Sequence, residues 1–353
     1  MFELREWSDV SSLPHATTST IEFFLQLQEL EIECSDDLIT IPGHLLLRIQ
    51  ALTITSAVYS SNTKMARKPC ATIAVGRYAQ TNIGARIEYL LEQSSKFLLR
   101  HLAIEGLDEL CYLPKQLLKL SSLESLSIRG CPKLMYIGEE NGAEFHGCLT
   151  SLQELSTDDC PELRYLPMPP TLVNLEIYLE YWTYKRCKLT VPSLEVLRNL
   201  TSLQYLSLRF EGCNSEEGER CWEEGRFCLT NLRELVIGPF SEELDYFPWP
   251  EVGMLKAQNP QHYPFMSLET LTMFGSSKHK CLPDQLPHLT SLRTLVIWGF
   301  QGLEALPEWL GNFSSLHSLS LLSCFQLARW PLLENSQLLK NLKSLRISHC
   351  PVL

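Results

Sequence analysis

Apolar residues recur along the chain in a pattern that predicts short strands. A leucine or isoleucine is followed three residues later by a second apolar residue and, after one further position, by a third, so that the unit reads L-x-x-L-x-[LI]. Side chains at alternate positions of an extended strand lie on the same face, so each unit predicts a strand with one apolar face. The units begin at Leu27, Ile49, Leu99, Leu123, Leu152, Leu172, Leu203, Leu232, Leu268, Leu292, Leu316 and Leu342.

One interval in this series is longer than the others and leaves room for a degenerate unit. It separates the units that begin at Ile49 and Leu99, and Cys70, Ile73 and Val75 in "CATIAV" fit the same spacing there. We therefore expect about thirteen repeats in a single domain over residues 1–353, with a degenerate part at 55–98 and an acidic insert at about 211–228. Both ends look like incomplete repeats, which favours a fragment truncated at both ends.

Three further positions keep the same spacing. Cysteine stands eight residues after the first leucine in several units, a leucine often stands eleven residues after it, and an apolar residue followed by proline closes many units. One strand cannot bury its own apolar face, so consecutive units stack and share one core. We predict an α/β repeat solenoid, a leucine-rich-repeat horseshoe with a parallel β-sheet on its concave side. The convex side is expected to be irregular with short helices, and proline is expected to end regular structure there.

The recurring cysteines are interpreted as buried structural thiols. Cys131, Cys160, Cys324 and Cys350 occur once per repeat and have no local partner with which to form a disulfide. Free cysteine is commonly buried and packs as a small apolar residue. No basic segment followed by an apolar run opens the chain, so a secretory signal is not visible and a reducing, cytoplasmic location is expected.

Charge and composition narrow the classes of partner. The net charge is -11 and the pI is about 5.4, which disfavours a nucleic acid as partner. No apolar run is long enough to cross a bilayer, so a membrane is not expected as a partner. Neither a phosphate-binding G-x-x-x-x-G-K-[ST] motif nor H-E-x-x-H, G-x-S-x-G or C-x-x-C occurs, and we expect no enzyme activity and no cofactor. His279, Cys281 and His288 lie close in sequence, but their spacing fits no common zinc site.

Candidate binding residues lie at outward positions of the predicted sheet. The position after the second inward strand residue is occupied in chain order by Glu33, Thr55, Glu105, Arg129, Asp158, Tyr178, Arg209, Gly238, Phe274, Trp298, Leu322 and Ser348. Successive members should lie about 5 Å apart, which places Phe274, Trp298 and Leu322 together as an exposed apolar strip. Arg209, across Gly238 from Phe274, is expected at its rim. Two readings of Trp298 stay open, an exposed anchor for a protein partner or a core residue covered by a loop or packed on Phe300.

We select as candidate protein-binding residues Arg129, Tyr178, Tyr205, Arg209, Phe274, Trp298 and Leu322.

The repeats also resemble a known family. The stretches "LESLSIRGCPKLMYI", "LQELSTDDCPELRYLP" and "LKSLRISHCPVL" are similar to the repeats of plant nucleotide-binding leucine-rich-repeat disease resistance proteins. The resemblance implies a protein–protein recognition module of an intracellular plant immune receptor, which senses effectors and restrains the receptor. The implied partners are a pathogen effector or a guarded host protein and the receptor's nucleotide-binding domain, which this sequence lacks. The alternative is a leucine-rich-repeat substrate adaptor for ubiquitin ligation. An extracellular ectodomain is less favoured, because N-x-L-x-G-x-I-P repeats and paired cysteine caps are absent.

Overall fold

The computed structural model describes part of the chain, and this part divides into two compact units. The described residues are 29–34, 51–56, 70–75, 87–88, 91, 99–138, 147–179, 200–210, 229–239, 247, 249, 265–330 and 341–353. The units are Met1–Pro169 and Pro170–Leu353. The expected acidic insert at 211–228 lies outside the described residues, as does most of the degenerate part at 55–98. The expectation of a single domain over the whole chain stays a prediction.

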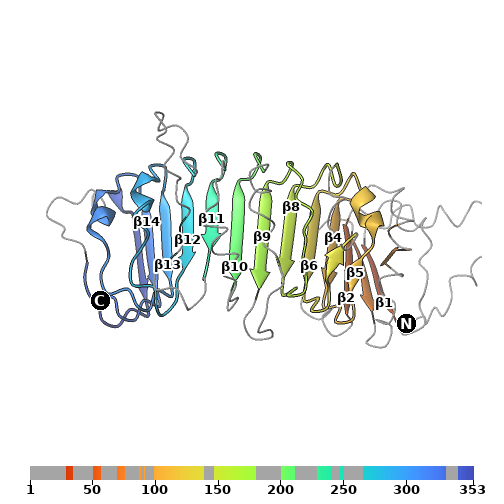
Figure 1. Cartoon of the computed structure of the whole chain (residues 1–353), viewed down its shortest axis with the longest axis horizontal. Coiled ribbons are helices and arrows are strands. Elements are labelled where there is room, and N and C mark those ends of the chain that lie inside the picture. Colours follow the sequence, from red (N-terminus) through yellow and green to blue (C-terminus); the bar gives the residue numbers. More distant parts are fainter. Residues whose placement is uncertain are drawn as a thin grey trace, which may run out of the picture. The chain divides into compact units, whose positions relative to one another are not determined.

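Each predicted repeat forms one parallel strand, and the fold is the predicted leucine-rich-repeat solenoid (Figure 1). In the first compact unit the hydrogen-bonded strand order is β1-β3-β2-β4-β6-β8, and in the second compact unit the order follows the chain from β9 to β15. The strands of the first unit are β1 (Glu29–Cys34), β2 (Ala51–Ser56), β3 (Cys70–Val75), β4 (His101–Glu105), β6 (Ser125–Arg129) and β8 (Glu154–Asp158). Those of the second are β9 (Asn174–Leu179), β10 (Tyr205–Phe210), β11 (Glu234–Ile237), β12 (Thr270–Phe274), β13 (Thr294–Trp298), β14 (Ser318–Leu322) and β15 (Ser344–Ser348).

The degenerate unit forms a strand, but its place in the sheet differs from its place in the chain. Strand β3 pairs with both β1 and β2, so that Ile73 is in register with Ile32 on one side and Ile54 on the other. Strand β2 then pairs directly with β4. All three strands carry the same alternating pattern, and any of them can pair with another. Periodicity therefore predicts the strand but not its place. The expected alignment of Ile73 with Leu52 is wrong, because Ile73 aligns with Ile54, two residues later.

The inward strand residues form continuous apolar rows. Leu271, Leu295 and Leu319 are in register on β12, β13 and β14, and none of the three has any exposed surface. The same holds for Ile297 and its neighbours in the next inward row. Each strand covers the apolar face of the next, as the repeat pattern predicts.

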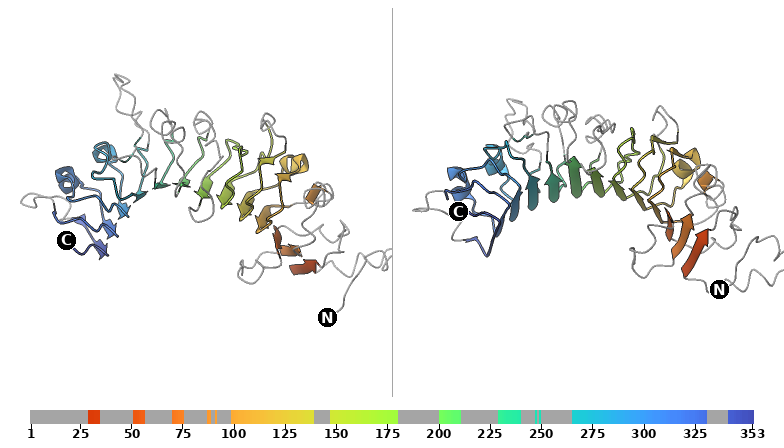
Figure 2. Two further views of the ribbon diagram at one scale, coloured as in Figure 1. Left: turned by 60° about the horizontal axis from the view of Figure 1, so that its bottom comes forward. Right: turned by 90° about the horizontal axis from the view of Figure 1, so that it is seen from below.

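The side of each unit away from the sheet carries 3-10 helices and short bridges (Figure 2). These elements are β5 (Tyr112–Leu113), β7 (Tyr136–Ile137), η3 (Lys115–Lys119), η6 (Leu286–His288) and η7 (Glu308–Asn312). Proline was expected to end regular structure, and β5 does end directly before Pro114, but Pro114 and Pro307 are also each the N-cap of a 3-10 helix. Their φ angles of -70° and -68° suit the entry to a helical turn, where the missing N–H would have had no partner. Proline here starts a short helix.

The recurring cysteines connect successive repeats. Cys131, Cys160 and Cys324 are buried, Cys350 is partly buried, and all four are free thiols. Each thiol lies 3.4–3.5 Å from the carbonyl oxygen two residues earlier. Those of Cys160, Cys324 and Cys350 also lie 3.6–3.9 Å from a strand carbonyl of the preceding repeat. A small side chain with a weak donor therefore fits this turn, which accounts for the recurrence of cysteine.

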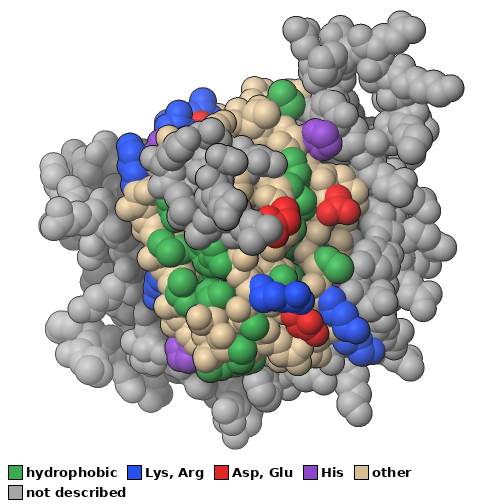
Figure 3. Space-filling model, turned by 90° about the vertical axis from the view of Figure 1, so that its left-hand side faces the viewer, with side chains coloured by type: hydrophobic (Ala, Val, Ile, Leu, Met, Phe, Trp, Pro, Cys, Tyr) green, Lys and Arg blue, Asp and Glu red, His purple; other side chains and the backbone are tan. Residues whose placement is uncertain are grey.

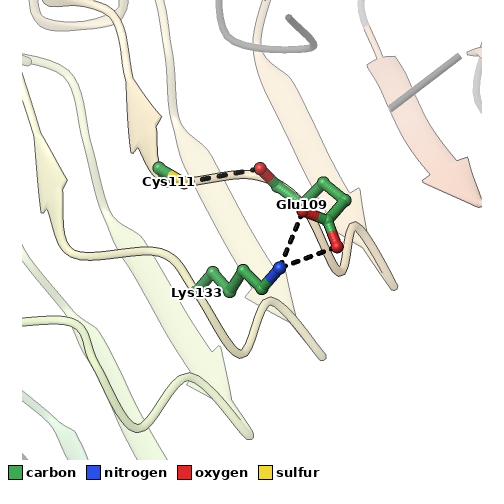
Figure 4. Close-up of polar contacts among 3 residues, drawn as sticks. All are labelled: Glu109, Cys111 and Lys133. Carbon is green, nitrogen blue, oxygen red and sulfur yellow. Dashed lines mark hydrogen bonds and ion pairs between the residues drawn. The ribbon is translucent and has the colours of Figure 1, made fainter. Parts of the chain in front are cut away.

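Ion pairs add contacts between neighbouring turns on the surface. The Lys133 ammonium lies 2.7 Å from both carboxylate oxygens of Glu109, while the Cys111 thiol contacts the Glu109 carbonyl (Figure 4). The hydrogen bond to Glu109 raises the pKa of Lys133. Both side chains are about half exposed, so solvent screens the pair and its contribution to stability is small.

The last strand of the second unit differs from the others in burial. Leu345 and Ile347 of β15 are 47% and 45% exposed, although they stand in register with the buried Leu319 and Leu321. Val352 and Leu353 are also exposed. Figure 3 looks onto this end of the second unit, where hydrophobic side chains reach the surface.

This difference in burial predicts different costs for the same substitution. Leu295→Ala should lower the free energy of unfolding by about 2–5 kcal/mol, because the change removes buried methyl groups and leaves a cavity. Leu345→Ala should cost about 1 kcal/mol or less, since its side chain is already largely hydrated. Urea titration of both variants followed by circular dichroism measures the two costs. Equal losses would contradict the burial described for β15.

Candidate functional site

Five outward residues of the second unit form a continuous row that we call the aromatic strip. Its members, one on each of β9, β10, β12, β13 and β14, are Tyr178, Arg209, Phe274, Trp298 and Leu322. Backbone register places Tyr178 beside Arg209, and places Trp298 between Phe274 and Leu322. The predicted neighbourhood of Phe274, Trp298 and Leu322 is confirmed.

Trp298 is exposed and supported by one aromatic neighbour. Its ring lies 5.2 Å from that of Phe274, with 32° between the planes, and 46% of the residue is exposed. Phe300, the alternative packing partner considered from the sequence, is fully buried. Its ring packs against Phe247 at 5.4 Å and His279 at 5.7 Å. Trp298 is therefore a surface residue, and the core reading of this tryptophan is wrong.

Arg209 belongs to the aromatic strip, although the sequence suggested a place at its rim. The guanidinium carbon lies 4.3 Å from the ring centroid of Tyr178 and 4.3 Å from that of Phe274. The cation thus bridges β9 and β12 and contacts two aromatic rings. Contacts of this kind are each worth about 0.5–1 kcal/mol when exposed to solvent. They also hold a long side chain in place before a partner arrives.

Gly238 lies close to the backbone of β12. It occupies the strip position after β11, between Arg209 and Phe274, and its φ is +88°. A Cβ atom built there would collide with the Phe274 carbonyl oxygen and lie 3.3 Å from the Phe247 ring. Glycine is therefore required at this position by its positive φ and by the close approach of the Phe274 carbonyl.

Tyr205 and Arg129 lie apart from the aromatic strip. Tyr205 is on the same strand as Arg209, but four residues earlier, about 13 Å away along the strand. Burial raises the pKa of Tyr205, and Glu176 and Glu234 act in the same direction, while Ser207 and Arg209 oppose them. Arg129 lies in the first unit, in register with Glu105 and Asp158. The outward column is therefore charged on β4, β6 and β8 and mainly aromatic and apolar on β9 to β14.

The three residues tested for a zinc-site spacing, His279, Cys281 and His288, differ in burial. His279 is buried, and its Nδ1 accepts a 3.0 Å hydrogen bond from the Ser276 N–H. Cys281 and His288 are exposed. Among the described residues, no group of three histidine, cysteine or acidic side chains is arranged to hold a metal ion. In the same part of the chain, no helix combines the length and apolar character needed to cross a bilayer.

Comparison with known proteins supports the repeat assignment. The family described as "R13L1/DRL21 LRRs" matches residues 262–350, a segment that contains β12 to β15. A comparison with curated protein sequences found no match. The repeat fold and the family match support a leucine-rich-repeat module for protein–protein interaction.

Solved structures with a similar fold include three from different sources. The leucine-rich repeat domain of the type III effector XopL has a TM-score of 0.44 at 19% identity, over 83% of this chain and 88% of that one. The TLR13–ssRNA13 complex has a TM-score of 0.41 at 14% identity, over 92% and 55%. A Leptospira interrogans leucine-rich-repeat protein has a TM-score of 0.36 at 18% identity, over 89% and 86%.

The burial of the cysteines predicts their reactivity. Burial, reinforced by the neighbouring Cys350, raises the pKa of Cys324 to about 12. The pKa of Cys160 also lies well above its usual value, because its thiol hydrogen bonds with Cys131 and is buried. At about pH 8, iodoacetamide should therefore modify the exposed Cys111 and Cys281 while Cys160 and Cys324 stay unmodified until the protein unfolds. Peptide mass spectrometry after timed alkylation measures this order.

Gly238→Ala should destabilise the second unit. The positive φ and the contact with the Phe274 carbonyl predict a loss of about 1–3 kcal/mol in the free energy of unfolding. Gly147→Ala is a matched control, because its φ is also positive but no atom lies within 4 Å of the added Cβ. A thermal melt that ranks Gly147→Ala as the more damaging change would contradict the role of Gly238.

Proposed function

We propose that this chain is the protein-recognition module of an intracellular plant immune receptor, and that the aromatic strip is its docking site. Two observations support the proposal. The repeats resemble those of plant nucleotide-binding leucine-rich-repeat proteins, and the R13L1/DRL21 match covers Phe274, Trp298 and Leu322. The partner would be a pathogen effector or a guarded host protein, met in the cytoplasm.

The observation that carries this proposal is the exposure of Trp298 beside Phe274 and Leu322. Tryptophan and arginine are over-represented among the residues that dominate binding energy at protein interfaces. A neighbouring ring at 5.2 Å supports Trp298, and two rings flank Arg209, so both side chains are held in place without a partner. Ordering them beforehand lowers the entropy lost on binding. The strip is thus suited to a partner that covers Trp298.

Restraint of the receptor would require a second contact. The sequence holds no phosphate-binding G-x-x-x-x-G-K-[ST] motif, so a nucleotide-dependent switch has to be provided by another polypeptide region. In this proposal the module binds that region in the resting state and a recognised protein in the active state. A competition binding experiment between the two partners decides whether both contacts use the aromatic strip.

Trp298→Ala should weaken binding of the recognised protein by about 2 kcal/mol or more while changing the free energy of unfolding by about 0.5 kcal/mol or less. Phe325→Ala is the matched control, because Phe325 is an aromatic residue that is 44% exposed but lies outside the sheet. Partners would be captured from plant cells by proximity labelling, purified, and titrated by calorimetry against the parent chain and both variants.

Three outcomes would contradict the proposal. Equal losses of affinity for Trp298→Ala and Phe325→Ala would show that the strip is not the docking site. A large loss of stability for Trp298→Ala would explain weaker binding by unfolding. Direct binding of purified ubiquitin-ligase subunits, with no effector or defence protein among the partners, would favour the substrate adaptor instead.

A further inference from the structure

The sheet formed by β13, β14 and β15 is basic, although the chain as a whole carries a net charge of -11. Arg346 stands at an outward position of β15, and Arg293 and Lys343 immediately precede β13 and β15. All three side chains are exposed, and within the described residues none has an ion pair. The outward positions of these three strands hold no acidic residue.

Arg293 and Lys343 belong to a row of residues that immediately precede the strands. This row follows the side of the sheet at which the strands begin, which we call the edge. The Arg293 N–H donates to the Glu269 carbonyl, the His317 N–H to that of Arg293, and the Lys343 N–H to that of His317. These backbone bonds fix the spacing of the side chains along the edge. Arg233 continues the row, but Glu269 lies 3.5 Å from it and offsets its charge. The uncompensated cations are therefore concentrated at β13 and β15.

The same edge is hollowed and polar. A groove of about 740 Å³ there is lined by Arg233, Glu269, Arg293 and His317, together with serine, threonine and asparagine side chains. Hydroxyl and guanidinium groups are suitable partners for a carboxylate. The groove can therefore receive the acidic part of a bound segment.

The aromatic strip lies at the opposite end of these strands. From Arg293 to Trp298 the chain advances five residues, or about 16 Å. Between them Thr294 and Val296 are half-buried outward residues, and Arg346 lies in the same row as Val296, across Ser320. Polarity thus changes along the strand direction, from cations and hydroxyls at one edge to aromatic and aliphatic side chains at the other.

We infer that the occupant of this face is an acidic, amphipathic segment of a protein. An apolar side chain of this segment covers Trp298 and Leu322. One of its carboxylates pairs with Arg346, and others pair with Arg293 and Lys343 at the edge. The inference rests on the proposed function and adds the chemistry and direction of the partner. Charge complementarity supports it, because these cations also raise the rate at which an acidic partner is captured.

Two other occupants fit the face less well. A nucleic acid presents a continuous row of phosphates that would extend beyond β13 to β15, and Glu176 on β9 and Glu234 on β11 would repel it there. A second copy bound through the same face would place the cationic face of one copy against that of the other. Both are measurable outcomes of the experiment below.

A short synthetic peptide tests the inference. It carries two glutamates at one end and a leucine and a phenylalanine at the other, separated by about four residues so that the extended peptide spans about 16 Å. The control peptide has glutamine in place of glutamate. Binding to the whole chain is followed by fluorescence anisotropy. The acidic peptide should bind and the glutamine peptide should bind several-fold more weakly. The difference should shrink between about 0.1 M and 1 M salt, as the screening length falls from about 10 Å to about 3 Å.

Variants separate the charge contribution from the apolar contribution. Arg346→Glu and Arg293→Glu should each weaken binding of the acidic peptide about fivefold or more, and should leave the glutamine peptide nearly unaffected. Lys280→Glu makes the same change in charge at an exposed residue outside the strands and should have little effect. Trp298→Ala should weaken the binding of both peptides.

The outcomes distinguish this inference from the proposed function. Equal affinity for the two peptides, or no effect of the Arg346 and Arg293 reversals, overturns the acidic partner and leaves Trp298 as a docking residue. Absence of peptide binding at about 1 mM also overturns the acidic partner, because the binding free energy would then be weaker than about -4 kcal/mol. Tighter binding of a uridine oligonucleotide, or a dimer in sedimentation that is lost on Trp298→Ala, overturns it in favour of the alternative occupant.

Discussion

The fold depends on one constraint, that a strand with an apolar face cannot bury that face by itself. Leu295 loses its exposed surface because Leu271 and Leu319 stand in register on either side of it. On β15, which among the described residues pairs with β14 alone, the equivalent Leu345 is half exposed. The backbone ladder and the buried thiols act in the same direction, since both tie a turn to the repeat before it. Burial in this chain is thus a property of neighbouring repeats.

That constraint leaves the outward residues free to vary, and the two units use this freedom differently. In the first unit Glu105, Arg129 and Asp158 make the column charged, and Glu105 is only 2% exposed. In the second unit the same column holds rings and one cation between them. Identical backbone geometry therefore carries two chemically different surfaces. The second is better suited to an apolar anchor, because its aromatic residues support one another at the surface.

The aromatic strip is joined across β11 by one long side chain. Arg209 and Phe274 are on strands separated by β11, which places them about 10 Å apart. The Arg209 side chain spans this distance, and its guanidinium carbon lies 4.3 Å from the centroid of the Phe274 ring. The basic edge lies at the opposite end of β13 and β15, where Arg293 and Lys343 are exposed.

The repeat pattern by itself determined which residues form strands and which of them point inward. It did so because alternate side chains of a strand lie on the same face, and the repeats place apolar residues at these alternate positions. Leu102, Leu206 and Leu295 occupy such positions and are buried. It also determined that Phe274, Trp298 and Leu322 are neighbours, since register in a parallel stack follows from the repeat alignment.

Tertiary structure alone decided where β3 lies, because three strands with one pattern can pair in more than one order. It also decided that Arg209 contacts Phe274 and that Trp298 is exposed. These depend on the reach of a side chain past Gly238 and on the burial of Phe300 against Phe247 and His279. Contacts of that kind join residues far apart in sequence, and no local spacing encodes them.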